Sequence, residues 1–426
     1  RTGTVDWCTT AKTSPFTSES GKGYFVNTTS GAVTVTLPAS PSAGDIVALK
    51  DYANTWDTNN VTICRNSSKI NGECANATLN TESQSVTLIY VDGTKGWQDI
   101  HDSTSDVTGA AFISATGGTV VTCGNFKTHI FTASGCFSVS RVGSPANNSI
   151  DYLVVAGGGG GGISEGGGGA GAGGFRISNG LGLPAPLTSP LATPTSITAS
   201  ATTYPITVGA GGAGGCTSTD SVSGSPSTFS TITSTGGGRG GRWNSPSDRP
   251  GGDGGSGGGG SGRNHPSTSY IAGSGNTPPV SPPQGNNGGN ATPSPTNPDR
   301  GGGGGGAGAA GTVAGSNGGA GGAGSFLDNN FIGPTAPSYG TPGPVSNTRY
   351  FAGGGGGGKD GDTPNGGTGG DGANGGGNGG SGDGSPRNAT AGTANTGGGG
   401  GGQGVSPQPG SGAGGSGIVM IRYKFQ

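Results

Sequence analysis

The sequence predicts an all-β protein: an N-terminal antiparallel β-sandwich module precedes a β shell that holds a large, ordered insertion of the polyglycine II type. Short segments of strand-forming residues recur at close spacing, which is typical of all-β folds. The chain has 103 glycines among 426 residues, and only 28% of its residues are hydrophobic. Globular domains contain roughly 45–50% apolar residues. An ordinary hydrophobic core therefore cannot account for the whole chain.

The change in composition along the chain predicts two domains. Residues 1–106 form the β-sandwich module, and residues 107–426 form the glycine-rich domain. Within the second domain, we expect a β shell from residues 107–156 and 417–426 around a polyglycine-type core, residues 157–416. The first residue is Arg1 and not Met, which suggests a processed chain or a fragment.

Alternating apolar and polar residues predict the strands of the first domain. Glycine, proline, asparagine and serine separate these segments, as they do at turns. We expect strands at residues 24–26, 32–37, 45–50, 61–65, 85–91 and 97–100. Trp7, Trp56 and Trp97 are the expected anchors of the core.

Three further strands are predicted before the first glycine run, at residues 127–132, 136–140 and 151–156. The last ten residues, 417–426, form another strand that we expect to pair back onto these. Between them, residues 204–208 and 227–233 are the clear apolar islands. The glycine tract is thus expected to be an insertion within a β shell.

Glycine loses more backbone entropy on ordering than any other residue, so a long glycine tract is disordered by default. Runs such as 301–306, 353–358 and 397–402 can become ordered if they lie side by side as extended threefold helices, because glycine lets backbones approach closely enough for lateral hydrogen bonds. Strict collagen periodicity is absent. The turns between runs would face solvent and suit receptor contacts.

Six cysteines form an even set. We expect disulfides from Cys64 with Cys74 and from Cys123 with Cys136, which leaves Cys8 and Cys216; inert buried thiols are the alternative. Asn-x-Ser/Thr sequons suit a glycosylated surface protein, although chance produces many in such a composition. They lie at Asn27, Asn60, Asn66, Asn76, Asn147, Asn290 and Asn388.

Several segments resemble proteins of known families. Residues 21–26, 32–38 and 44–53, continued by 86–97, resemble a module of structural and fibre proteins of marine viruses. Residues 151–160, 206–212 and 417–423 resemble the glycine-rich domain that follows it in viruses of cyanobacteria and small algae. The chain is also similar to phage adhesins with layered polyglycine helices. The resemblance implies a virion fibre, spike or adhesin that attaches to a host; a cellular extracellular filament or sheath that self-assembles is the alternative.

The sequence predicts no enzyme, cofactor, metal site, nucleic-acid partner or membrane span. Charge is sparse and nearly balanced, with 20 basic and 22 acidic residues and no basic cluster. His101, His129 and His265 lie in no recognisable catalytic arrangement. Residues 366–374 fit a calcium-binding nonapeptide pattern except at Ala373, where a large apolar residue belongs, and a true site needs several stacked copies. A glycan depolymerase would need paired carboxylates in a cleft, which glycine turns make hard to build.

Aromatic residues of the second domain have two interpretations. Trp243, Tyr270, Tyr339 and Tyr350, together with Phe326 and Phe331, could stack on sugars of a receptor, as an adhesin requires. The alternative is that they fill the edges of the glycine layers. The partners we expect are a second copy of the chain and a host surface glycan or receptor, with the protein on a virion surface or outside the cell.

Overall fold

The computed structural model describes residues 5–102, 111–163, 165–183, 187–216, 219–243, 249–262, 270–292, 299–360, 375–380, 388–404 and 410–426. The chain forms two compact units. Unit 1 comprises Arg1–Phe112 and Gly143–Asn147, and unit 2 comprises Ile113–Val142 and Asn148–Gln426. The fold is all-β, as predicted: among the described residues, the one α-helix, α1, spans Asn329–Ile332.

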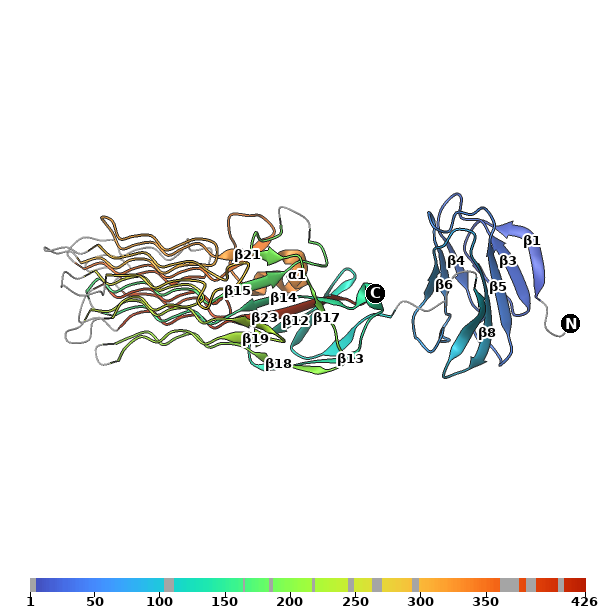
Figure 1. Cartoon of the computed structure of the whole chain (residues 1–426), viewed down its shortest axis with the longest axis horizontal. Coiled ribbons are helices and arrows are strands. Elements are labelled where there is room, and N and C mark those ends of the chain that lie inside the picture. The colour runs from blue at the N-terminus through green and yellow to red at the C-terminus, as the bar shows by residue number, and fades with distance from the viewer. Residues whose placement is uncertain are drawn as a thin grey trace. The chain divides into compact units, whose positions relative to one another are not determined.

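Unit 1 contains two open sheets (Figure 1). The first has the order β1-β3-β5-β8-β9 and the second the order β2-β4-β6-β7. The strands are β1 (Asp6–Lys12), β2 (Phe16–Thr17), β3 (Lys22–Val26), β4 (Val33–Thr36), β5 (Ile46–Asp51), β6 (Val61–Cys64), β7 (Ala77–Leu79), β8 (Ser85–Asp92) and β9 (Gly96–Asp102). A short 3-10 helix, η1, spans Pro145–Asn147.

The strand pairing in unit 1 corrects the antiparallel prediction. Strands β1 to β6 alternate between the two sheets along the chain, so that β1, β3 and β5 pair in parallel, as do β2, β4 and β6. Successive coils therefore stack as in a short solenoid. Only β7, β8 and β9 add antiparallel pairs. Alternation within a strand reveals its buried face but not its partner, which is why the sequence did not show this order.

Side chains from both sheets of unit 1 form one hydrophobic core. Val26 and Leu49 come from the first sheet, and Val35 and Ile63 from the second. Trp56 and Trp97 are completely buried in this core, as predicted. The prediction for Trp7 is wrong, because 41% of its surface is exposed on β1 at the edge of the sheet.

Unit 2 has a central sheet of the order β11-β12-β23-β14-β15-β16, a second sheet β10-β13-β18-β19-β20, and the pair β21-β22. Strand β17 pairs with β14, and the 3-10 helix η2 (Gly333–Ser338) follows α1. The strands are β10 (Ser114–Thr116), β11 (Thr119–Cys123), β12 (Phe126–Phe131), β13 (Gly135–Arg141), β14 (Ser149–Val155), β15 (Phe175–Ser178), β16 (Ala192–Thr193), β17 (Ile197–Thr198), β18 (Thr203–Thr207), β19 (Ser227–Phe229), β20 (Ile232–Ser234), β21 (Ser325–Asp328), β22 (Thr348–Phe351) and β23 (Ile418–Lys424).

The C-terminal strand β23 completes the central sheet, as predicted. It lies between β12 and β14 and pairs antiparallel with both. Both faces of this sheet are covered, so most residues of β14 and β23 are buried and apolar. Leu153 and Met420 point into one core, with Phe331 of α1, and Val154 and Ile421 point into the other, with Phe137 of the second sheet.

Glycine runs extend from these sheets side by side (Figure 1). The run 157–162 lies among six others: its N–H groups donate to the runs 168–171, 222–225 and 412–415, and its carbonyls accept from the runs 209–212, 237–240 and 400–403. Gly157 and Gly160 both donate to the run 222–225, because residues three apart point the same way in a threefold helix. The six donated bonds measure 2.7 to 3.1 Å. We call this arrangement the glycine lattice.

Close approach of backbones explains why the lattice consists of glycine. A Cβ at Gly160 would overlap with the carbonyl oxygen of Ala213 in the neighbouring run. Similar overlaps with backbone atoms occur along the run 301–306. Side chains larger than those of alanine and serine are therefore confined to the outside and the ends of the lattice.

Side-chain oxygens replace missing neighbours on the outer runs. Asn290 Oδ1 accepts from the N–H of Ala272 at 2.9 Å, and Asn287 Oδ1 accepts from the N–H of Gly275 at 2.8 Å. Thr312 Oγ1 accepts from the N–H of Ala320 in the same way, at 2.7 Å. These bonds satisfy outward backbone donors without another glycine run.

The tract 157–416 is not one continuous lattice. Strands β15 to β20 and the segment from β21 to β22 interrupt it and belong to the sheets of unit 2. The apolar island at residues 227–233 folds as the hairpin β19-β20, with Ser230 at positive φ. Phe175, Ile177 and Leu327 have side chains too large for the lattice, so these segments pack in the hydrophobic cores instead.

His129 of β12 gives unit 2 a measurable pH dependence. It is buried, its Nδ1 lies 2.6 Å from the carbonyl of Gly117, and its Nε2 lies 3.0 Å from the hydroxyl of Tyr423. Burial lowers the pKa of His129. Below about pH 6.5 the unfolded chain binds a proton at His129 more readily than the folded chain does, so the free energy of unfolding falls as the pH falls. We expect His129→Gln to reduce this loss, measured by thermal unfolding between about pH 7.5 and pH 5. Equal pH dependence in both proteins would contradict it.

Substitution in the glycine lattice tests its close packing. We expect Gly160→Ala to destabilise unit 2 by about 1–3 kcal/mol or more, because the added methyl group overlaps with the backbone around Ala213. Gly315→Ala is the matched control, since a Cβ there meets no atom within 4 Å; it should change stability by less than about 0.5 kcal/mol. The measurement is unfolding in denaturant. Similar losses for the two variants would refute close packing as the reason for glycine.

Candidate functional site at the end of the glycine lattice

Charged and aromatic side chains gather at the end of the lattice that is distant from the sheets. Backbone bonds from Gly262 to Gly166, from Gly166 to Gly404 and from Asp360 to Asp299 connect the runs at this end. We define the terminal layer by its described residues that carry larger side chains. These are Glu165, Asp220, Arg242, Trp243, Arg249, Tyr270, Asp299, Arg300, Lys359, Asp360 and Gln403.

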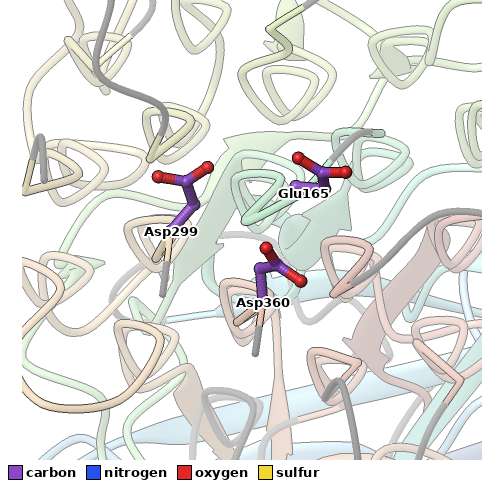
Figure 2. Close-up of side chains that lie close together, drawn as sticks. All are labelled: Glu165, Asp299 and Asp360. Carbon is purple, nitrogen blue, oxygen red and sulfur yellow. The ribbon is translucent and has the colours of Figure 1, made fainter. Parts of the chain in front are cut away.

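Three carboxylates of the terminal layer point toward one another (Figure 2). One oxygen from each of Glu165, Asp299 and Asp360 lies within 4.8 Å of the other two. Asp299 and Asp360 are only 3% and 7% exposed. Like charges at this separation repel one another and attract a cation. Oxygen ligands suit Ca²⁺ or Mg²⁺, but Ca²⁺ takes six to eight of them, so three side chains would make an incomplete site.

A second charged group of the terminal layer centres on Asp220. Its carboxylate forms ion pairs with Arg242 and with Arg249, the latter at 3.3 Å. Arg242 and Arg249 also exchange backbone bonds of 2.9 Å. Arg239 lies one threefold turn before Arg242. Burial, followed by the charge of Arg249, lowers the pKa of Arg239. This group ties three segments of the layer together by charge.

Basic residues lie beside the backbone of the carboxylate cluster. Arg300 and Lys359 follow Asp299 and precede Asp360, and they form an antiparallel bridge. Burial, followed by the charge of Arg300, lowers the pKa of Lys359. The Lys359 amine donates to Asn317 Oδ1 at 3.3 Å, and Arg300 donates to the carbonyl of Gly315 at 3.1 Å. Both side chains thus anchor the connection near residues 315–317.

The structure separates the four aromatic residues predicted to face a receptor. Trp243 and Tyr270 belong to the terminal layer, and Tyr270 is 37% exposed. Tyr339 and Tyr350 lie at the other end, beside the sheets. Tyr350 is buried against Phe326, with ring centroids 5.4 Å apart, and Tyr339 packs on a hydrophobic core. Tyr350 therefore does not face solvent, because strand β22 turns it inward.

The fold does not bring Cys123 and Cys136 together. Cys123 ends β11 at the turn of the β11-β12 hairpin, whereas Cys136 lies next to Gly117, before the start of that strand. The residues 119–123 alone span roughly 13 Å, and a disulfide requires Cα atoms within roughly 7 Å. Cys8, Cys64 and Cys216 are half-buried and Cys74 is exposed. No disulfide is present among the described cysteines, and the other pairings stay predictions.

The predicted glycosylation sites differ in accessibility. Four of the asparagines are exposed: Asn60, Asn76, Asn290 and Asn388. Asn27 and Asn66 are half-buried, and the Asn66 amide donates to the carbonyl of Leu37 at 2.8 Å. The Asn147 amide donates to Ser144 Oγ at 3.0 Å. At Asn290 only the oxygen is engaged, so its amide nitrogen remains the better acceptor for a glycan.

Two features singled out in the sequence, His265 and the calcium-like segment 366–374, lie outside the described residues. The carboxylate cluster was not predicted, because its members come from three connections far apart in the sequence and share no motif. Within the described part of the chain, no helix has the length and apolar character to cross a membrane.

The sheets, the glycine lattice and the terminal layer define a class: a β-anchored, glycine-rich scaffold. The glycine-rich domain family matches residues 132–424, more than half of the chain, and the chain belongs to this family. The match begins before β13 and ends with β23, so it spans the whole lattice together with the strand that closes the central sheet. No curated protein matches the chain significantly.

Removal of one charge from the carboxylate cluster tests whether its members repel one another. We expect Glu165→Gln to raise the thermal unfolding midpoint of unit 2 by about 1–3 °C in the presence of a chelator, because Asp299 and Asp360 lose a like-charged neighbour. Glutamine keeps the size of the side chain. A fall in the midpoint would contradict net repulsion and would show that the Glu165 carboxylate is held by favourable partners.

Proposed function

We propose that this protein is a structural surface protein, a virion fibre or spike or an extracellular adhesin, which attaches to a host through the end of its glycine lattice. The proposal rests on one observation: in unit 2, the backbone-bonded lattice and the charged and aromatic side chains occupy different places. Backbone bonds between glycine runs hold the lattice. Charged and aromatic side chains gather at one end, where they are available for recognition.

The chemistry of the terminal layer fits a binding surface. Trp243 and Tyr270 supply aromatic rings, and Arg242 and Arg249 supply guanidinium groups, the residue types enriched in binding hot spots. A host glycan or a surface protein is the expected partner. We propose no catalytic function, because Asp299 and Asp360 are buried and a polysaccharide could not reach a pair of carboxylates there.

The alternative is a cellular filament or sheath that self-assembles. The outer lattice runs argue against sideways growth of the lattice, because Asn287, Asn290 and Thr312 already satisfy backbone donors that another run would need. Electron microscopy of the purified chain separates the two functions. Discrete particles, together with immunogold labelling of virions or cell surfaces, support attachment. Long filaments formed by the chain alone would overturn it in favour of the alternative.

Binding measurements test the terminal layer. We expect Trp243→Ala and Tyr270→Ala each to weaken binding of the full chain to host envelope preparations about tenfold or more, because an anchoring ring is lost. Val120→Ala is the control: Val120 is 49% exposed on β11 of the central sheet and does not belong to the terminal layer. Surface plasmon resonance on immobilised envelopes measures the affinity. Unchanged binding by both aromatic variants would place recognition elsewhere in the chain.

A further inference from the structure

The outer face of the first sheet in unit 1 carries aromatic rings that its core does not use. Tyr24 and Val26 of β3 point into the core, so Gly23 and Phe25 point to the other face. Trp7 pairs with Gly23 across β1 and β3, and Phe25 pairs with Lys50 across β3 and β5. Trp7, Phe25 and Lys50 therefore share the outer face.

Three rings on this face lie in a row. The ring centroids of Trp7 and Phe25 are 5.1 Å apart, and those of Phe25 and Tyr52 are 6.5 Å apart. Trp7 is 41% exposed and Tyr52 is 58% exposed. We call Trp7, Phe25 and Tyr52 the aromatic row. Nearly all other large rings in unit 1 serve the core, as Trp56 and Trp97 do.

Gly23 makes room for the first ring of the aromatic row. A Cβ at Gly23 would lie 2.7 Å from Cδ2 of Trp7, so the indole lies flat across this glycine. One face of the indole covers the sheet, and the other contributes to the exposed surface. Trp7 is thereby held on a rigid strand and not on a mobile loop, which lowers the entropy lost on binding.

Polar groups lie at the Tyr52 end of the aromatic row. The exposed ion pair of Lys22 Nζ with Asp6, at 2.7 Å, belongs to the opposite face of the sheet, because these residues precede Gly23 and Trp7 in their strands. Near Tyr52, Ser83 Oγ lies 2.8 Å from Asn54 Oδ1, and Lys50 Nζ donates to the carbonyl of Ser83 at 2.5 Å. Donors and acceptors thus lie at one end of an apolar strip. Such an arrangement suits a ligand with apolar faces and a polar edge.

The exposed area of the aromatic row is too small for a stable protein interface. An aromatic side chain offers roughly 150–250 Å² in total, so Trp7 and Tyr52 together expose roughly 200–250 Å². A stable interface buries roughly 800 Å² on each partner. A small ligand of one or two rings fits the available area.

We propose that the aromatic row is a carbohydrate-binding site that stacks pyranose rings on Trp7 and Tyr52. The C–H faces of a pyranose pack on the aromatic rings, and its hydroxyl groups bond to the polar groups near Tyr52. The planes of Trp7 and Phe25 differ by 38° and those of Phe25 and Tyr52 by 76°, so the row is bent. A bent row favours a soluble, flexible or branched glycan over a flat polysaccharide surface. This site is separate from the terminal layer and does not depend on its function.

Binding of defined oligosaccharides to the full chain tests the site. The probes are cellohexaose, maltohexaose and a β-galactose hexasaccharide, each at up to about 10 mM, and the readouts are saturation-transfer NMR and tryptophan fluorescence. We expect at least one probe to bind, and Tyr52→Ala and Trp7→Ala to weaken it at least tenfold. Tyr52→Phe keeps the ring and should retain binding within about threefold.

Val91→Ala is the matched control, because Val91 is 45% exposed on β8 of the same unit and lies outside the aromatic row. Tyr52→Ala keeps the test valid if Trp7→Ala disturbs the fold, since Tyr52 is mostly exposed. The proposal is overturned if no probe binds, or if the Tyr52→Ala protein binds as well as the wild type. Trp243→Ala should leave oligosaccharide binding to this site unchanged, which separates the result from the function of the terminal layer.

Discussion

Hydrogen bonds between the backbones of neighbouring glycine runs are the interaction on which unit 2 depends. Consecutive residues of the run 157–162 donate to different neighbouring runs, and this pattern repeats every three residues, so the run is held on all sides without a hydrophobic side chain. The requirement for close approach excludes a Cβ at positions such as Gly160. The same requirement moves every charged or aromatic group to the outside or to the ends of the lattice. The position of the terminal layer is thus a consequence of the packing.

The glycine lattice needs the sheets because it has little apolar surface of its own to bury. The central sheet is covered on both faces. The whole lattice lies between β14 and β23 in the sequence, and these two strands pair with each other in the sheet. The sheets therefore fix both ends of the insertion at one place. Unit 1 follows a different principle: parallel strands stack in coils around an ordinary hydrophobic core, and this regular stacking leaves an outer sheet face on which Trp7 and Tyr52 are displayed.

Hydrophobic periodicity and composition predicted most of the strands but few of the strand pairings. Residues 417–426 were expected to return to the early strands, because an apolar segment after a glycine tract has no other surface to cover. The burial of Trp56 and Trp97 followed from their size. Trp7 was misassigned, because nothing near it in the sequence shows that β1 is an edge strand. The parallel pairing of β1, β3 and β5 was missed for a related reason, since alternation is the same in parallel and antiparallel sheets.

By itself, the sequence determined that the protein is all-β and that its glycine runs must satisfy their backbone groups laterally, since these properties depend on local residue type. The tertiary structure decided which connections meet. Glu165, Asp299 and Asp360 come together, whereas Cys123 and Cys136 do not, although they are close in sequence. The physical reason is that a threefold glycine helix offers nearly equivalent bonding on every side. The choice of neighbour is therefore made by the turns and sheets, whose long-range packing no local pattern records.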